Sequence, residues 1–249
     1  MTIVFSVIMQ QLIVMSADSA VTLDFGDTRE YREGRKSFFY PGVGCVTTWG
    51  ARNGNHIGDY LEGLHISPER HTVENLASFV HEYLSREYRP DQIGLDDVGY
   101  HVAGFDRQRR PRLFHVFYGF DRPRSAEQTE REYKMYDHTP PPEDVQFLYN
   151  GRNDLAHVVV QTMFLQLASG SDSRFRLDDP VSLVCFADFV SRFGAELTPE
   201  VGPPFLTYLI SPRNESARLR NDHLSPISHM NIITELRNLG YLIQEVRAA

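Results

Sequence analysis

The chain begins with Met1 and Thr2, and a threonine in second place can carry chemistry. In the cytosol an initiator methionine is trimmed when the next residue is as small as threonine, and trimming would give Thr2 a free α-amine. That amine can accept the proton of the threonine's own hydroxyl, which makes a weak alcohol a nucleophile. Met-Thr is also an ordinary way to begin a protein, so the dipeptide alone assigns no role to Thr2.

Lysine is rare in this chain, so each lysine could fill a role for which arginine is poorly suited. Among the 25 basic residues, only Lys36 and Lys134 are lysines. Arginine is bulkier, and its guanidinium is a rigid planar fork, whereas the lysine ammonium is compact. Each lysine therefore raises the question of a role that arginine could not fill.

We expect the strands and helices that would position these residues to be grouped along the chain, strands with strands and helices with helices, rather than to alternate strictly. Apolar and β-branched runs predict strands at residues 2–9, 12–17, 36–50 (two strands about Pro41-Gly42), 98–106, 112–120, 145–151 and 204–211. Helical spacing predicts helices at 53–66, 72–87 (capped by Thr72), 154–168, 179–194 (Pro180 in its first turn, Gly194 at its end) and 229–240. This order favours stacked layers of mainly antiparallel sheet under helices.

The remaining stretches are polar or open to a second interpretation. Residues 24–34 and 121–144 are expected as turns or surface excursions, and the basic run 107–112 as a solvated hairpin turn. The first apolar run could be read as a signal peptide. However, no lysine or arginine precedes Arg29, and two glutamines interrupt the run, so two short strands fit better.

Composition narrows the class of protein. A net charge of -8 argues against nucleic-acid binding, and no apolar stretch is long enough to cross a membrane. Cys45 and Cys185 both lie in apolar runs, which predicts buried thiols in a reducing compartment, so we expect a cytoplasmic protein. The ten histidines lack metal-ligand spacing and no nucleotide-binding fingerprint is present, so we expect neither a metal nor a cofactor.

Several motifs in the first half of the chain form one ordered pattern with defined spacings. Thr2 is followed by Ile3, Asp18 comes sixteen residues later within Ala-Asp-Ser, and Lys36 begins the third predicted strand. Gly50 closes the next strand, fourteen residues after Lys36. The pattern of residues 98–116 is that of a hairpin with glycine, aromatic and aspartate before its turn. Together the motifs resemble the proteasome β-type N-terminal nucleophile (Ntn) hydrolases, including their bacterial ring-forming relatives.

The resemblance is clear over residues 2–120 and weaker from there to residue 211. It predicts the fold, the assembly and the substrates of the protein. It implies an α+β fold: a four-layer αββα sandwich of two mainly antiparallel sheets flanked by helices. The domain would cover residues 2–211, with a C-terminal extension at 212–249 that packs on it through a short amphipathic helix. The resemblance also implies a homo-oligomer of rings or stacked rings, peptides or unfolded proteins as substrates, an ATPase as a further partner, and no cofactor.

The resemblance further implies a role for each matching residue. Thr2 Oγ would attack an amide carbonyl, with its own α-amine as the base. Lys36 would lower the pKa of that amine and hydroxyl, and Asp18 would hold the ammonium in place. The backbone N–H of Gly50 would donate to the oxyanion. By the same register, Thr48 and Arg52 would lie near the pocket for the side chain before the cut, where Arg52 hints at acidic or polar substrates.

The second half departs from the pattern of the family. In place of its Ser-Gly-Ser and Asp-x-x-Ser-Gly-Gly motifs the chain has "YNGRND" and "LTPEVGPP". Asn150 or Asn153 could supply a polar group beside the threonine amine, and Thr198 or Glu200 could replace the aspartate. None of them matches residue for residue, and a poorly oriented base costs much of the rate.

The leading hypothesis is thus a threonine amidohydrolase, a peptidase that becomes active when Met1 is removed. Two alternatives remain open. One is a catalytically inactive scaffold or binding subunit of the same fold, which the altered second half favours and the intact Thr2, Asp18 and Lys36 oppose. The other is an Ntn hydrolase of a small amide, for which a monomer or dimer with an open site would be expected.

Overall fold

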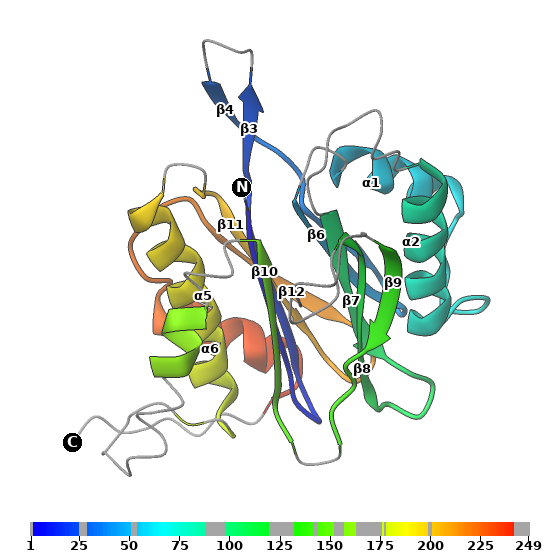
Figure 1. The fold of residues 1–249 in the computed structure, drawn as a ribbon. Coiled ribbons are helices and arrows are strands. Elements are labelled where there is room, and N and C mark those ends of the chain that lie inside the picture. Colours follow the sequence, from blue (N-terminus) through cyan, green and yellow to red (C-terminus); the bar gives the residue numbers. More distant parts are fainter. Residues whose placement is uncertain are drawn as a thin grey trace.

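The protein is built as four layers in the order helix, sheet, sheet, helix (Figure 1). The computed structural model describes residues 2–24, 29–50, 54–87, 98–119, 132–141, 144–151, 157–162, 176, 178–198 and 201–241. Within these residues both large sheets are antiparallel throughout. The predicted α+β sandwich is therefore confirmed.

The first sheet carries the start of the chain at its centre. Its strand order is β10 (Gln146–Gly151), β1 (Ile3–Ile8), β2 (Ile13–Asp18), β11 (Phe205–Ile210) and β12 (Ser216–Asn221). Its outer face is covered by α5 (Pro180–Leu197), α6 (His229–Asn238) and the helical residues 157–162. Because β1 and β2 are buried on both faces, they read in sequence as nearly continuous apolar runs.

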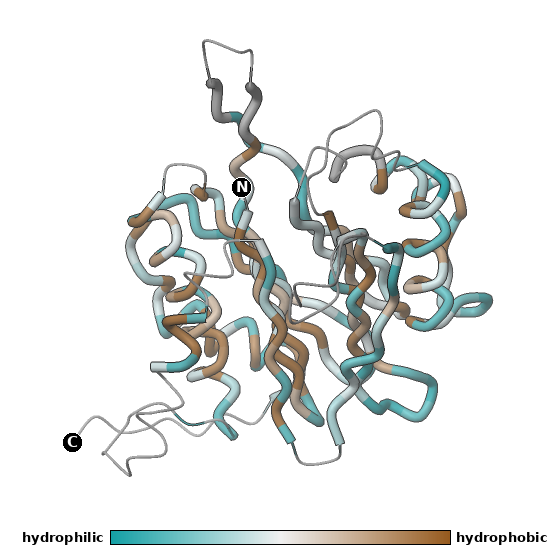
Figure 2. Tube along the Cα trace, in the orientation of Figure 1, coloured by the Kyte–Doolittle hydropathy of each residue, from teal (hydrophilic) through white to brown (hydrophobic). Residues whose placement is uncertain are grey.

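The second sheet begins just after Lys36. Its strand order is β5 (Ser37–Tyr40), β6 (Gly44–Gly50), β7 (Val98–Phe105), β8 (Pro111–Gly119) and β9 (Glu132–Asp137). Its outer face is covered by α1 (Gly54–Gly63) and α2 (Val73–Glu87). The hydrophobic residues gather in the strands and on the inward faces of these helices (Figure 2).

Alternation along β1 decides which of its side chains face the second sheet. Ile3 and Phe5 pack in the cluster under α5, whereas Val4 and Ile8 pack against residues of the second sheet. Successive side chains of a strand point to opposite faces, so Thr2 and Ser6 share the inter-sheet face with Val4 and Ile8. The start of the chain therefore lies between the two sheets.

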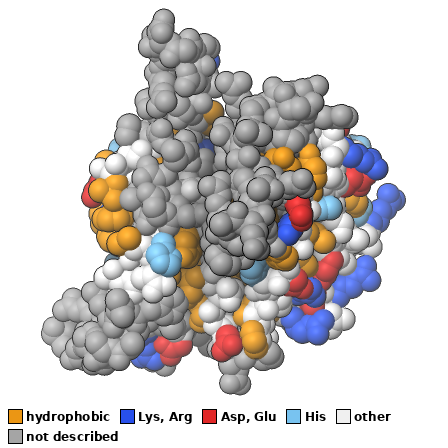
Figure 3. Space-filling view, in the orientation of Figure 1, with side chains coloured by type: hydrophobic (Ala, Val, Ile, Leu, Met, Phe, Trp, Pro, Cys, Tyr) orange, Lys and Arg blue, Asp and Glu red, His pale blue; other side chains and the backbone are white. Residues whose placement is uncertain are grey.

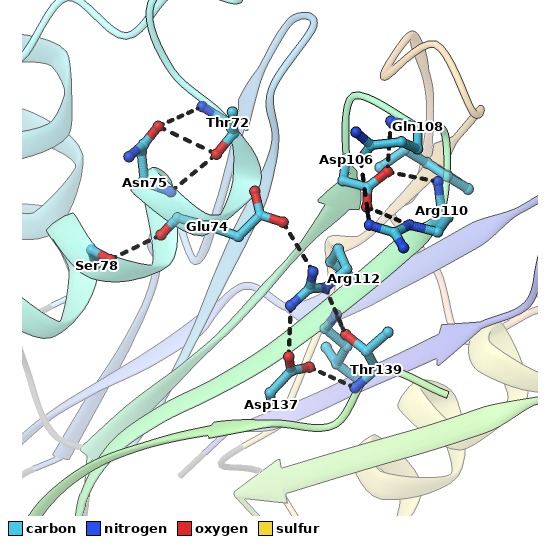
Figure 4. A network of polar contacts seen from close by, with 12 residues as sticks. Thr72, Glu74, Asn75, Ser78, Asp106, Gln108, Arg110, Arg112, Asp137 and Thr139 are labelled. Atoms are coloured by element: carbon cyan, nitrogen blue, oxygen red, sulfur yellow. Dashed lines mark hydrogen bonds and ion pairs between the residues drawn. The ribbon is translucent and has the colours of Figure 1, made fainter. Parts of the chain in front are cut away.

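The predicted cap of α2 is present. Thr72 N–H and Oγ1–H both donate to Asn75 Oδ1 (3.0 and 3.2 Å), and Asn75 N–H donates back to Thr72 Oγ1 (3.4 Å) (Figure 4). The reciprocal bonds satisfy donors that the first turn of a helix leaves free. The Arg112 guanidinium of β8 then joins Glu74 (3.2 Å) to Asp137 (2.6 Å), which fastens α2 to the sheet below.

Helix α5 begins as predicted but ends later. Asp179 accepts hydrogen bonds from the N–H groups of Val181 and Ser182, and Pro180 occupies the first turn. The helix continues past Gly194 to Leu197. A Cβ on Gly194 would clash with the Ile3 side chain, so this glycine allows close packing of α5 on β1 and does not end the helix.

Three polar segments form strands that the sequence patterns did not predict. The stretch 24–34 contains β4 (Arg29–Glu33), which pairs with β3 (Ala20–Asp24) as a hairpin projecting from the body (Figure 1). The stretch 121–144 contains β9, whose side chains are exposed or half-buried. Beyond residue 211, β12 extends the first sheet and α6 packs on it. These strands lie at sheet edges or outside the core, where apolar alternation is weak.

The surface of the second sheet's half of the molecule is charged. Basic and acidic side chains lie side by side over the region of α2 and the β7–β8 turn (Figure 3). Residues 107–110 of the predicted basic turn are exposed, and Arg110 is paired with Asp106 at 2.8 Å (Figure 4). Of the two free cysteines, Cys45 is buried as predicted, whereas Cys185 is half-buried.

Candidate active site

The fold brings Thr2, Lys36 and Asp18 into direct contact. Lys36 Nζ donates to Thr2 Oγ1 at 2.8 Å and to Asp18 Oδ2 at 3.0 Å. Asp18 Oδ1 accepts from the N–H of Ile3 (3.0 Å), and Oδ2 also accepts from the N–H of Ala20 (3.2 Å). All three side chains are buried, with Thr2 4% exposed, Lys36 6% and Asp18 0%.

Each of the three comes from a different element, and the sheet register explains why they meet. Asp18 ends β2, and Val4 lies opposite Ala17 in the pairing of β1 with β2, so Asp18 stands beside the start of β1. Lys36 lies just before β5, where its carbonyl accepts from the N–H of Thr48 in β6 (2.9 Å). The site therefore lies where the start of β1 and the end of β2, two interior strands of the first sheet, face the start of β5 in the second sheet.

Burial governs the electrostatics of the Lys36–Asp18 pair. Burial lowers the pKa of the Lys36 ammonium, and the nearby Asp18 carboxylate opposes that shift. Burial likewise raises the pKa of Asp18, against hydrogen bonds from Lys36 and from the backbone of Ile3 and Gly202. A hydroxyl that accepts a hydrogen bond from a buried ammonium is favoured to carry negative charge, as a nucleophile must.

The structure describes two of the three residues predicted for the oxyanion and the substrate pocket. Gly50 is the exposed last residue of β6, with φ +88°, a backbone conformation that favours glycine. Thr48 is buried, two residues earlier on the same strand. Arg52 lies outside the described residues.

The polar candidates of the second half are used in other ways or lie outside the described residues. Asn150 Oδ1 is hydrogen-bonded to His101 Nε2 at 2.7 Å. Thr198 caps the C-terminal end of α5, where its N–H donates to the Gly194 carbonyl (3.0 Å). Asn153 and Glu200 lie outside the described residues.

Two glycines at the site were missed because they act through their backbone. Gly151 has φ +97°, lies opposite Ile3 in the sheet register, and a Cβ there would clash with the Thr2 carbonyl. The Gly202 carbonyl accepts from Ser19 N–H at 3.3 Å, next to Asp18. The only sequence signal was a glycine at a strand end and another in a proline-rich loop.

The described residues contain neither a metal-binding cluster nor a membrane-spanning helix. No group of three or more His, Cys, Asp or Glu side chains among them could hold a metal ion. No helix in the same part of the chain combines the length and hydrophobicity that crossing a membrane requires.

The structure resembles solved structures of Anbu proteins. Anbu (ancestral beta-subunit) from Yersinia bercovieri matches with a TM-score of 0.57 at 13% identity, over 96% of this chain and 93% of that one. Anbu from Hyphomicrobium sp. strain MC1 matches with a TM-score of 0.57 at 14% identity, over 99% of this chain and 100% of that one. A structure described as the helical assembly of the Anbu complex from Pseudomonas aeruginosa matches with a TM-score of 0.53 at 14% identity, over 96% and 93%.

These comparisons correct the assignment made from the sequence motifs. No protein-family model and no curated protein matches the sequence. The assignment to the proteasome β-type family was therefore wrong, since the solved structures reported above are named as Anbu proteins and no family model supports that assignment. Identities of 13–14% over nearly the whole chain establish the fold alone, and that fold is the Ntn-hydrolase sandwich of the Anbu proteins.

Proposed function

We propose that this protein is a threonine-type Ntn amidohydrolase that becomes active when Met1 is removed. The observation that carries the proposal is the hydrogen bond of 2.8 Å from Lys36 Nζ to Thr2 Oγ1, with Asp18 holding the same ammonium at 3.0 Å. A buried ion pair costs desolvation, and a strand end needs no such pair to fold. Placed against a hydroxyl at the start of the chain, the pair suits nucleophile activation.

The proposed chemistry gives each of these groups one role. Thr2 Oγ attacks the carbonyl carbon of an amide while the freed α-amine takes the hydroxyl proton, and the Lys36 ammonium stabilises the developing alkoxide. The Gly50 N–H donates to the oxyanion of the tetrahedral intermediate. The amine leaving group takes the proton, an ester of Thr2 remains, and water hydrolyses it to regenerate the hydroxyl.

A peptide is the substrate class that we propose, and a homo-oligomer is the working form. Thr48 lies on the β6 strand that ends at Gly50, and with Arg52 it would border the pocket for the side chain before the cut. The Pseudomonas aeruginosa Anbu complex is described as a helical assembly, which supports self-association for a chain of this fold. Light scattering on the purified protein tests this part: a large assembly agrees with it, and a monomer or dimer favours hydrolysis of a small amide.

The intact mass of the protein with an epoxyketone probe tests the nucleophile. Such a probe closes a ring only with the hydroxyl and the α-amine of the same N-terminal threonine. We expect a mass that lacks methionine and one adduct per chain. Thr2→Ala should take up none, and Lys36→Ala should react at least ~100-fold more slowly because the alkoxide loses its ammonium.

Lys134→Ala is the matched control, since Lys134 is the other lysine and its ammonium pairs with Glu132 on β9 at 3.1 Å. It should react like the wild-type protein. If methionine is retained, or a trimmed chain never takes up a threonine-directed probe, the protein is instead a catalytically inactive scaffold of the same fold.

A further inference from the structure

Three polar residues form a buried hydrogen-bonded network between the two sheets, close to Thr2. Ser6 of β1, His101 of β7 and Asn150 of β10 are 0%, 0% and 2% exposed. Ser6 Oγ lies 2.9 Å from His101 Nδ1, and His101 Nε2 lies 2.7 Å from Asn150 Oδ1. One imidazole therefore bonds both to β1, the first strand of the chain, and to β10, which pairs with β1 in the first sheet.

The partners of the ring determine where its proton lies. Asn150 Oδ1 can only accept, so His101 Nε2 must carry the hydrogen and donate it. In the neutral ring Nδ1 then accepts, and the Ser6 hydroxyl donates to it. The ring leaves neither nitrogen without a partner, as a buried polar group requires.

Both ends of this hydrogen-bonded network, the Ser6 arm and the Asn150 arm, are connected to Thr2. Ser6 lies on β1, which begins directly after Thr2, and its side chain faces the same inter-sheet space as that of Thr2. Asn150 immediately precedes Gly151, whose backbone lies against the Thr2 carbonyl so closely that no Cβ fits there. A shift of Asn150 would move Gly151, and with it the carbonyl of the residue that carries the nucleophile.

We propose that His101 is a positioning residue for Thr2: its bond to Asn150 fixes the end of β10, and so the Gly151 backbone, against the nucleophile. The inference rests on the proposed function and deepens it, because it assigns Asn150 a role other than direct contact with the threonine amine. The Asn150 arm sets the position of Gly151, and the Ser6 arm holds the ring in its plane.

Two conservative substitutions separate the arms. His101→Gln keeps an amide donor at the place of Nε2 and can still reach Asn150, whereas His101→Asn keeps a polar group only at the place of Nδ1, toward Ser6. His101→Phe removes both bonds and fills the space. The matched control is Thr47→Val, because Thr47 is fully buried opposite His101 in the β6–β7 register and no bond joins the two side chains among the described contacts.

The readouts are the rate constant for epoxyketone capture at saturating probe, the apparent probe affinity, and hydrogen exchange of the β10 peptide. We expect His101→Phe to lower the rate constant about 10- to 100-fold with little change in affinity, since small misplacements of a reacting group cost this much. Exchange in residues 146–151 should rise in the same variant. His101→Gln should recover most of the rate, His101→Asn should not, and Thr47→Val should stay within about twofold of the wild-type rate.

Two results overturn the inference while the proposed function stands. One is a folded His101→Phe variant that reacts at the wild-type rate, and the other is equal rates for His101→Gln and His101→Asn. The second comparison decides the matter even if His101→Phe does not fold. A wild-type chain that takes up no probe overturns the proposed function itself, and the inference with it.

Discussion

Lys36 is the residue on which the chemistry of the site depends. The residue is 6% exposed, and its ammonium lies between a hydroxyl and a carboxylate, at 2.8 and 3.0 Å. The planar fork of arginine needs more room than a compact ammonium and directs its donors within one rigid plane. Lys36→Arg should therefore not restore the probe reaction that Lys36→Ala loses.

The Gly151 backbone is the contact at this scale that is easiest to test. Gly151→Ala forces a side chain into φ +97° and into the Thr2 carbonyl. We expect the free energy of unfolding to fall by about 2 kcal/mol or more, and the probe reaction to be lost, because strain and clash add. Chemical denaturation and the intact-mass assay measure the two effects.

Gly63→Ala serves as the control for this variant. Gly63 is the last residue of α1 and a Cβ there meets nothing within 4 Å. Its stability should change by less than about 1 kcal/mol, the size of the helix-propensity difference between the two residues. A Gly151→Ala protein as stable and reactive as Gly63→Ala would refute the close approach.

Among the elements, α5 holds the last part of the described chain to the first sheet. The buried Asp188 of α5 accepts from Arg192 Nε (2.7 Å), from Asn221 Nδ2 at the end of β12 (3.0 Å) and from the N–H of Ile227 (3.2 Å). The segment between β12 and α6 is thus tied to the helix by one carboxylate. Helix α6, which follows, packs against α5 and β12 through its buried residues Ile232 and Leu236.

Asp188→Ala should therefore destabilise the protein by about 3 kcal/mol, because the largely buried Arg192 guanidinium loses its ion-pair partner and the Asn221 amide keeps only the Ser225 carbonyl as an acceptor. Hydrogen exchange should rise in residues 222–238 before it rises in β1 or β2. Asp178→Ala is the control, since Asp178 also pairs with an arginine, Arg176 at 2.7 Å, but both side chains are exposed. That variant should leave both measurements unchanged.

Across the whole molecule, the two sheets meet through apolar clusters and one row of histidines. His101 faces Ser6 and Asn150 of the first sheet, its ring lies 5.5 Å from that of His115, and the ring of His138 lies 6.0 Å beyond. Burial lowers the pKa of His101 to about 4, and the nearby His138 adds to that shift against the hydrogen bond with Asn150. The inter-sheet layer therefore holds a histidine that resists protonation.

The stability of the protein should consequently depend on pH. Between the ordinary histidine pKa of 6.5 and about 4, the unfolded chain binds a proton that folded His101 does not. The stabilisation is fully present above pH 6.5 and is lost as the pH falls toward 4, by about 3 kcal/mol. Urea denaturation at several pH values should show a shallower fall for His101→Gln, while the control His223→Gln, at an exposed histidine, should follow the wild-type protein.

The sequence by itself determined that mainly antiparallel sheets would stack under helices, and it determined most of the core. Strands buried on both faces and helices with one apolar stripe have strong local signatures, so β1, β2, α2 and α5 were predicted to within a few residues. The pairing of Lys36 with Asp18 was also expected, although only through the spacing of a resemblance. That resemblance led to the wrong family, since the solved structures of similar fold reported above are Anbu proteins.

Only the tertiary structure decided what surrounds Thr2. The close approach of Gly151, the contact of Gly202 with Ser19, and the bond from His101 to Asn150 join residues far apart in the chain through backbone atoms or single hydrogen bonds. Such contacts leave no periodic trace, since a glycine or an asparagine at a strand end looks the same whatever lies across the sheet. Hydrophobic periodicity specifies which face of an element is buried, whereas the register between elements specifies which polar groups meet there.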